Sequence, residues 1–276
     1  QLTVTHEGTE VYTDVRSVAD LGSGQTATVL FPTLTTDLGQ WVLTATTMLA
    51  GDQWADNDTA VGTFTCLDRE RNPFAILYTN WGCGPCVPAN QSLDAWYPLQ
   101  GDAASLIRVH VGWPASNDPM YLANTTEADF LLDMCPTDVT GVPTLYQDNV
   151  FDAWDASGSW DDRVSFVYEQ SAATPSPVAM QIFFDPQTAE VEVLVDVLQA
   201  LDPATDWILH VAVTEDGVEA LGANGEPVHN QVFRRLFPGT GGTPVATDVG
   251  LHAYTVPLSL DPAWRSEERR VGKECI

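Results

Sequence analysis

The sequence predicts an α/β domain flanked on both sides by β structure. A short apolar run, residues 74–79, precedes a Cys-x-x-Cys pair and a stretch with helical spacing. The flanking segments, residues 1–66 and 171–264, instead alternate apolar and polar side chains, as half-buried strands do. A chain of 276 residues is long enough for two or three domains.

The central region, residues 67–170, is expected to begin with a buried strand. Asn72 and Pro73 introduce residues 74–79, which are rich in strand formers. The elements expected after it are a helix over 88–99 that ends at Pro98, a strand over 105–111, and a Gly-Val-Pro-Thr turn (141–144) leading into a strand. Strands and helices therefore alternate in this region.

Cys83 and Cys86 lie at the expected start of that helix, in the sequence Trp-Gly-Cys-Gly-Pro-Cys. The free N–H groups and the dipole at a helix N-terminus favour a thiolate, so Cys83, the more exposed of the two, is the predicted nucleophile. Cys86 is the predicted resolving thiol. A zinc site would need a second ligand pair, but His110 and Cys135 are isolated. The sequence thus predicts a redox-capable pair without a metal or cofactor.

The order of these elements and motifs resembles the thioredoxin superfamily, and Cys-Gly-Pro-Cys is the tetrapeptide of thioredoxin itself. The resemblance implies that Pro143 follows a cis peptide bond, lies against the disulfide and guides the substrate backbone. Protein thiols or disulfides are the implied partners. Candidate residues of the substrate groove are Trp81, Gly84, Pro85 and Val142.

Three positions depart from the thioredoxin pattern. Gly82 stands where thioredoxin has Trp, and Val87 stands where it has a basic residue. Leu77 occupies the place of a buried Asp that helps proton transfer from the second Cys, so no carboxylate can act as the base there. The sequence therefore does not predict the direction of electron flow.

Further stretches of the sequence resemble a smaller group of proteins with this type of domain. An insertion that thioredoxin lacks, within residues 109–121, and the patterns at 211–217 and 229–234 resemble exported bacterial proteins described as outer-membrane-protein-related. Those proteins carry a thioredoxin-like domain followed by a β domain. The resemblance covers most of residues 67–264 and implies a periplasmic, outer-membrane-associated or cell-surface location.

The flanking segments are expected to be all-β. Strands predicted at 3–5, 26–31 and 41–46 resemble the later part of a bacterial cell-adhesion-related immunoglobulin-like domain, truncated at its start. After a linker rich in Ser, Ala, Thr and Pro, residues 171–264 are expected to form a C-terminal β-sandwich, with strands at 189–197 and 206–214.

The last residues, 265–276, differ in composition from the rest. They hold Lys273, the only lysine of the chain, and read as the in-frame translation of a sequencing adapter. We therefore interpret them as read-through and exclude them from the fold. The chain also begins at Gln1 without a signal peptide, so we expect a metagenomic gene fragment whose natural termini lie beyond it.

Without Cys275 four cysteines remain, and Cys83–Cys86 with Cys66–Cys135 is the natural pairing. Cys66 and Cys135 are then either a structural disulfide or two unrelated thiols. A structural disulfide would imply an oxidising compartment.

The composition excludes two other classes of protein. A net charge of −27 argues against nucleic-acid binding, which depends on neutralising phosphates with Lys and Arg. No apolar run approaches the roughly 18 residues that span a bilayer.

Two functions follow as hypotheses. The first is an exported thiol–disulfide oxidoreductase that acts through Cys83 and Cys86. The alternative is a non-catalytic surface or adhesion protein, in which the α/β domain is a scaffold and the same two cysteines form a static disulfide.

Overall fold

The computed structural model of the chain describes residues 1–6, 8–18, 21–22, 25–36, 39–49, 51, 54–66, 71–262 and 264. The stretch interpreted as adapter sequence, residues 265–276, lies outside this part. The chain divides into two compact units, residues 1–69 and 70–276, and each is described by itself.

The first unit contains one antiparallel sheet. In spatial order its strands are β2 (Thr9–Asp14), β1 (Leu2–His6), β3 (Gly39–Thr46) and β4 (Thr59–Cys66), and a 3-10 turn, η1 (Ala55–Asn57), precedes β4. The strand predicted at 26–31 is wrong: these residues form no strand and are mostly exposed, so they have no core to pack on. An immunoglobulin-like sandwich needs a second sheet, which is not among the described strands of this unit, so that assignment stays a prediction.

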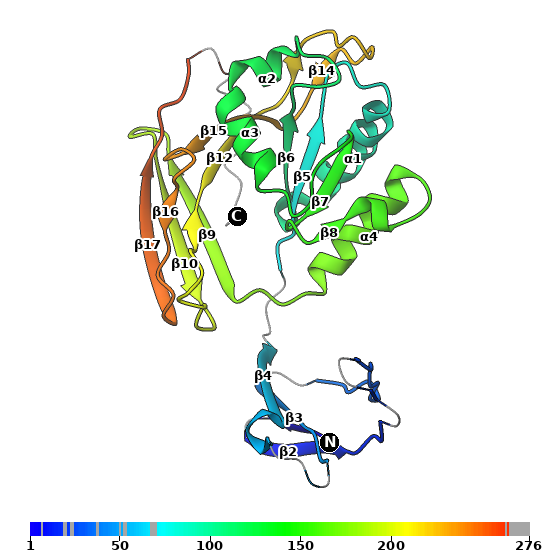
Figure 1. Cartoon of the computed structure of the whole chain (residues 1–276). Helices are drawn as coiled ribbons and strands as arrows, with labels where there is room; N and C mark the ends of the chain where they lie inside the picture. The colour runs from blue at the N-terminus through cyan, green and yellow to red at the C-terminus, as the bar shows by residue number, and fades with distance from the viewer. Residues whose placement is uncertain are drawn as a thin grey trace. The chain divides into compact units, whose positions relative to one another are not determined.

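The second unit is built on a six-stranded mixed sheet (Figure 1). In spatial order its strands are β12 (Val211–Glu215), β15 (Val232–Phe237), β6 (Ser105–His110), β5 (Phe74–Thr79), β7 (Thr144–Gln147) and β8 (Phe151–Asp152). β5 and β6 run parallel, whereas β7 runs antiparallel to β5. The predicted strand at 74–79 is confirmed as β5, and all its side chains are buried.

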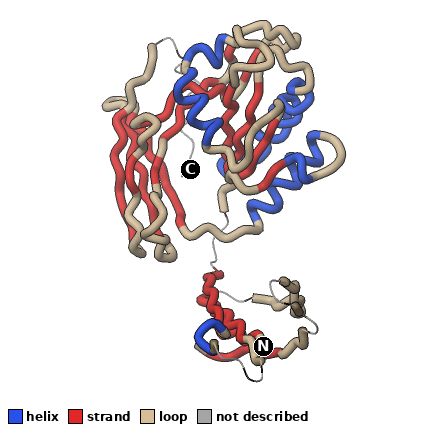
Figure 2. The backbone as a smooth tube through the Cα atoms, in the orientation of Figure 1, coloured by secondary structure: helices blue, strands red, loops and turns tan. Residues whose placement is uncertain are grey.

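Helices cover both faces of this sheet, as Figure 2 shows. They are α1 (Cys86–Gln100), α2 (Pro119–Ala123), α3 (Thr125–Asp133) and α4 (Trp160–Ala172), with 3-10 turns η2 (Gly101–Ala103) and η3 (Ala153–Asp155). Leu77 of β5 shares an apolar cluster with α1 and α4, and Tyr78 shares another with α3. Because successive side chains of a strand point to opposite faces, these two neighbours place α1 and α3 on opposite sides.

The helix α1 is longer than predicted. It continues through Pro98 to Gln100, so the expectation that Pro98 ends it is wrong. A proline lacks the amide that bonds four residues back, so α1 continues through Pro98 without that one hydrogen bond.

The C-terminal segment, residues 171–264, contributes strands to more than one sheet. β12 and β15 belong to the central sheet. The other strands are β9 (Val178–Asp185), β10 (Glu190–Val197) and β17 (Gly250–Pro257) in one antiparallel sheet, and the short pairs β11 (Ile208–Leu209) with β16 (Thr243–Pro244) and β13 (Val218–Glu219) with β14 (Val228–His229). An apolar cluster joins Val193 of β10 to Val213 of β12 and Phe237 of β15. The segment therefore shares its core with the α/β region, where the sequence led us to expect a separate sandwich.

Candidate redox site

Cys83 and Cys86 form a disulfide between the end of β5 and the start of α1. Their Cα atoms are 5.3 Å apart, and the amide of Cys86 donates a hydrogen bond to Sγ of Cys83 at 3.1 Å. The helix begins at Cys86 itself, so the sulfur of Cys83 lies just before its N-terminus. An amide donor and a helix N-terminus both favour the thiolate of Cys83 once the disulfide is reduced.

Both cysteines are buried. Cys83 is 3 % exposed and Cys86 is fully buried, so the expected difference in exposure between them is small. The residues between them, Gly84 and Pro85, are exposed. The surface of the motif is therefore formed by Gly84 and Pro85.

Pro143 lies on one side of the disulfide. The Val142–Pro143 peptide bond is cis, as the resemblance implied, and the carbonyl oxygen of Val142 is 3.4 Å from Sγ of Cys83. The indole N–H of Trp154, in η3, donates to the carbonyl of Pro143 at 3.0 Å. We call this side of the motif, residues 137–144 with Asp152 and Trp154, the proline side.

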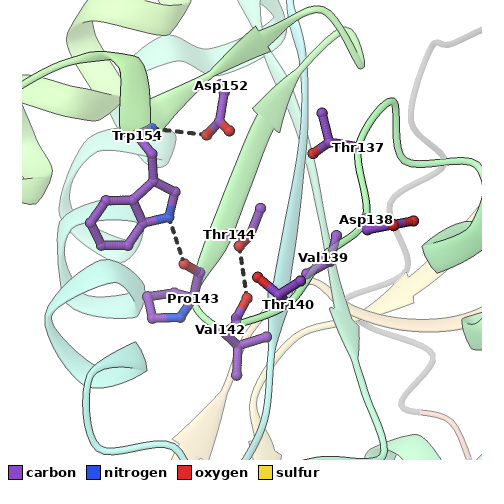
Figure 3. A pocket seen from close by; sticks show the side chains of 10 residues that line it. Thr137, Asp138, Val139, Thr140, Val142, Pro143, Thr144, Asp152 and Trp154 are labelled. Atoms are coloured by element: carbon purple, nitrogen blue, oxygen red, sulfur yellow. Dashed lines mark hydrogen bonds between the residues drawn. The ribbon is translucent and has the colours of Figure 1, made fainter.

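A cavity of about 330 Å³ opens on the proline side (Figure 3). Trp154 forms one wall, 52 % exposed, with its other contacts made to Trp160 and to the guanidinium of Arg163. The remaining lining residues are Thr137, Asp138, Val139, Thr140, Gly141, Val142, Pro143, Thr144 and Asp152. Of the sequence-predicted groove residues, Val142 lines this cavity, whereas Trp81, Gly84 and Pro85 do not. Trp154 was missed because nothing near it in the sequence connects it to Pro143.

The insertion after β6 contacts the motif from a second side. Asp118 is fully buried and accepts hydrogen bonds from the amide of Trp81 at 2.8 Å and from Nδ1 of His110 at 2.7 Å. Burial raises the pKa of Asp118, but the hydrogen bond and charge of His110 and the Trp81 amide outweigh it, so the pKa is lowered overall. An ionised carboxylate therefore fixes the chain two residues before Cys83. The Asp-Pro pair, which begins α2, was the available sequence signal for a helix cap.

Asn80 also connects the insertion to the Cys-x-x-Cys motif. Its buried side chain donates to the carbonyls of Val111 and Ala115 and accepts from the amide of Gly82. A Cβ atom on Gly82 would lie 2.5 Å from Cβ of Ala115. The departure from Trp at this position thus has a steric reason: the insertion occupies the space that a side chain would need.

A loop of the C-terminal segment also contacts the motif. Residues 220–227 connect β13 to β14, and we call them the strap. The amide of Asn224 donates to the carbonyl of Trp81 at 3.1 Å, and its side chain donates to the carbonyl of Cys83 at 3.2 Å. The insertion and the strap together form what we call the closed side of the motif.

Leu77, Val87 and Cys135 are the remaining positions that the sequence analysis singled out. Leu77 is fully buried in the apolar cluster beneath α1, and Val87 is half-buried. Cys135 is a free thiol packed against the cluster around Tyr78, and burial raises its pKa. The expected Cys66–Cys135 disulfide stays a prediction, because the side chain of Cys66 lies outside the described part.

Within the described residues, no group of three or more His, Cys, Asp and Glu side chains is arranged to hold a metal ion. None of the helices that the structure describes combines the length and the apolar character needed to cross a bilayer.

Comparison with known proteins gives a similarity of fold. No protein-family model and no curated protein matches this sequence. Among solved structures, the chain is similar to HBP35 of Porphyromonas gingivalis, with a TM-score of 0.58 and 13 % identity, over 72 % of this chain and 67 % of that one. It also matches protein AGR_C_4864 from Agrobacterium tumefaciens with a TM-score of 0.46 and 15 % identity, over 69 % of this chain and 80 % of that one. At such identity the likeness to HBP35 concerns the fold alone.

Proposed function

We propose that this protein is a thioredoxin-like thiol–disulfide oxidoreductase that acts on protein thiols or disulfides. One observation carries the proposal: the Cys83–Cys86 disulfide lies at the start of α1, with Sγ of Cys83 3.4 Å from the carbonyl of Val142, directly before cis Pro143. The resemblance of both motifs to the thioredoxin superfamily supports it.

The chemistry needs only these two cysteines. In the reducing direction, the thiolate of Cys83 attacks a substrate disulfide, forming a mixed disulfide and releasing one substrate thiolate. The thiolate of Cys86 then attacks Sγ of Cys83, which re-forms the Cys83–Cys86 disulfide and releases the second substrate thiolate. Two electrons pass from the dithiol to the substrate, and the reverse sequence oxidises a substrate dithiol.

The proline side is the proposed place of the substrate. The cavity beside Pro143 offers an aromatic wall, Trp154, and lies next to the carbonyl of Val142. Gly84 and Pro85 are exposed and leave room for a substrate chain beside the disulfide. Trp81 is half-buried, and its main chain bonds to Asp118 and to the strap, so it belongs to the closed side and not to the proposed substrate cavity.

Export belongs to the same proposal. A disulfide persists in oxidising compartments, such as the periplasm or the cell surface. The resemblance to exported outer-membrane-protein-related proteins supports this location. Residues 1–66 would then be an adhesion-type immunoglobulin-like domain in the same chain as the redox unit.

One observation favours the alternative, a scaffold with a static disulfide. Cys83 is only 3 % exposed and Cys86 is fully buried, which restricts attack by a protein substrate. In that case the β regions of a surface or adhesion protein would do the binding.

Insulin reduction by the full chain in the presence of dithiothreitol separates the two functions. We expect turnover that disappears in Cys83→Ser, because that variant lacks the nucleophile, and that persists in Cys135→Ser. Turnover no higher than that of Cys83→Ser, together with a reduction potential below about −300 mV, would instead establish the static disulfide.

A further inference from the structure

The strap and the disulfide loop are far apart in sequence but bonded in the structure. Asn224 and Cys83 are separated by 141 positions, and the side chain of Asn224 donates to the carbonyl of Cys83. The amide of Asn224 also donates to the carbonyl of Trp81. One residue therefore bonds to the main chain on both sides of Gly82.

A carboxylate holds Asn224 in this position. Glu226 accepts from the side chain of Asn224 and from Nδ2 of Asn90 at 2.9 Å, and Oδ1 of Asn224 accepts from the amide of Glu226. Asn90 lies on α1, one turn after Cys86. The strap is thus fastened at two points, to the loop through Asn224 and to the helix through Glu226.

The approach of the strap to the loop is close. A Cβ atom on Gly222 would lie 2.7 Å from the carbonyl oxygen of Trp81. Gly222 is buried, and its amide donates to the carbonyl of Glu226 at 2.7 Å, which closes the turn. The strap therefore rests directly on the main chain that leads into Cys83.

The strap itself has little apolar anchoring. Leu221 is 73 % exposed, and residues 223, 225 and 227 are also exposed. The contacts that fasten it to the loop and to α1 are the polar ones described above. A segment held by a few hydrogen bonds and little buried apolar surface opens at low cost compared with global unfolding.

We propose that the strap is a gate, with Asn224 as the residue that latches it. When Asn224 releases the carbonyls of Trp81 and Cys83, the loop is free to shift and to expose the Cys83–Cys86 disulfide to thiols on the proline side. This inference deepens the proposed function, because it assigns the accessibility of the same site to a segment of the C-terminal region. Asn224 acts on the main chain of Cys83 and is a positioning residue, since it does not touch the sulfur. The gate explains how a disulfide with 3 % exposure at Cys83 is made available for exchange.

The gate makes a kinetic prediction that a purely stabilising contact does not make. A gate limits both reduction and oxidation, so weakening it speeds both by the same factor and leaves the reduction potential unchanged. A contact that stabilises only one redox state changes one rate more than the other and shifts the potential.

The experiment measures both rates on the full chain. The oxidised protein is reduced with dithiothreitol and the reduced protein is oxidised with oxidised dithiothreitol, with the state of Cys83 and Cys86 read by quenched alkylation and mass spectrometry. Asn224→Ala removes the side-chain bond to Cys83 together with the two bonds to Glu226 inside the strap. Gly222→Ala crowds both the carbonyl oxygen of Trp81 and Oδ1 of Asn224, so it weakens the latch sterically. Leu221→Ala, at an exposed position of the same segment, is the matched control.

We expect both rates to rise about fivefold in Asn224→Ala, the factor given by the loss of its one side-chain hydrogen bond between strap and loop. Gly222→Ala should raise both rates at least as much, and Leu221→Ala should match the wild type. Unchanged rates in folded Asn224→Ala and Gly222→Ala, or a rise in one direction only, would overturn the gate. The readout does not depend on insulin turnover, so a protein that fails to reduce insulin still tests the strap.

Discussion

The two sides of the Cys-Gly-Pro-Cys loop are built in opposite ways. On the proline side, a cavity of about 330 Å³ lies beside Pro143, and the carbonyl of Val142 is the near contact of the Cys83 sulfur. On the closed side, Asp118 from the insertion and Asn224 from the strap bond directly to the main chain around Gly82. The proline side leaves space for a substrate, whereas the closed side fixes and covers the loop.

This contrast gives a reason for one departure from the thioredoxin pattern, the glycine at position 82. The residues that face the proline side, Val142 and Pro143, fit the thioredoxin pattern. Gly82, which departs from it, faces the insertion, and the main chain beside it faces the strap. Of the three departures, Gly82 alone therefore coincides with a part of this chain that thioredoxin lacks, whereas Leu77 and Val87 lie in and beside the core under α1.

The largest effect is expected from removing the buried carboxylate of the closed side. Asp118→Ala leaves the ring nitrogen of His110 and the amide of Trp81 buried without their partner, at about 1–3 kcal/mol for each, so the free energy of unfolding should fall by about 2–6 kcal/mol. Urea denaturation measures this change. Asp129→Ala, which removes only an exposed hydrogen bond to Tyr121, is the control, and an equal loss in both variants would contradict the role of Asp118.

A smaller loss is expected from filling the space at Gly82. Gly82→Ala places a methyl group 2.5 Å from Cβ of Ala115, and such overpacking costs about 1–3 kcal/mol. The double variant Gly82→Ala, Ala115→Gly should recover most of this loss. Gly84→Ala is the matched control, because no atom lies within 4 Å of its added Cβ. Equal thermal stability of the two single glycine variants would argue against the steric account.

On the proline side, a single hydrogen bond can be removed. Trp154→Phe keeps an aromatic ring but loses the indole N–H that donates to Pro143, which should cost about 0.5–1.5 kcal/mol of unfolding free energy. Trp160→Phe keeps the ring that contacts Trp154 and leaves the bond to Pro143 in place. If thermal denaturation shows equal stability for the two variants, the hydrogen bond from Trp154 to Pro143 does not stabilise the fold.

The smallest effect is a pH dependence on the closed side. His229, at the base of the strap, has its pKa lowered by burial and then by the charge of His110, against the opposing effects of the Ala220 carbonyl, Glu226 and Asp118. The folded state therefore prefers neutral His229. Its contribution to stability is complete above pH 6.5, the ordinary value, and declines as the pH falls below it.

Denaturation at pH 7.5 and 5.5 measures that decline. We expect His229→Gln to lose less stability than the wild type between these two conditions. His252→Gln, which alters a histidine near the surface, should behave as the wild type does. If His229→Gln loses as much stability between pH 7.5 and 5.5 as the wild type does, His229 is not the cause of the decline.

The elements that are local in sequence were predictable. β5 follows from a run of apolar strand formers, and the cis bond before Pro143 follows from the resemblance of the Gly-Val-Pro-Thr turn. The pairing of Cys83 with Cys86 follows from their spacing. These features depend on neighbouring residues, so a sequence pattern contains them.

The closed side was not predictable, because its contacts are non-local. Asn224 reaches Cys83 across 141 positions, and nothing in the residues around it indicates that contact. Residues 206–214 alternate as a strand of a separate sandwich would, yet β12, which begins within them, pairs with β15 in the central sheet, since alternation defines a half-buried strand but not its partner. The strand expected at 26–31 failed for the same reason: the pattern was present without a neighbour to pair with.

Trapping a mixed disulfide tests the central claim, exchange through Cys83, most directly. In Cys86→Ser the resolving thiol is absent, so the full chain incubated with oxidised glutathione should accumulate a glutathione adduct on Cys83, located by peptide mass mapping. Cys135, the free thiol whose pKa is raised by burial, serves as the internal comparison and should react more slowly. An unmodified Cys83 beside a modified Cys135 would contradict the claim that Cys83 is the exchanging thiol.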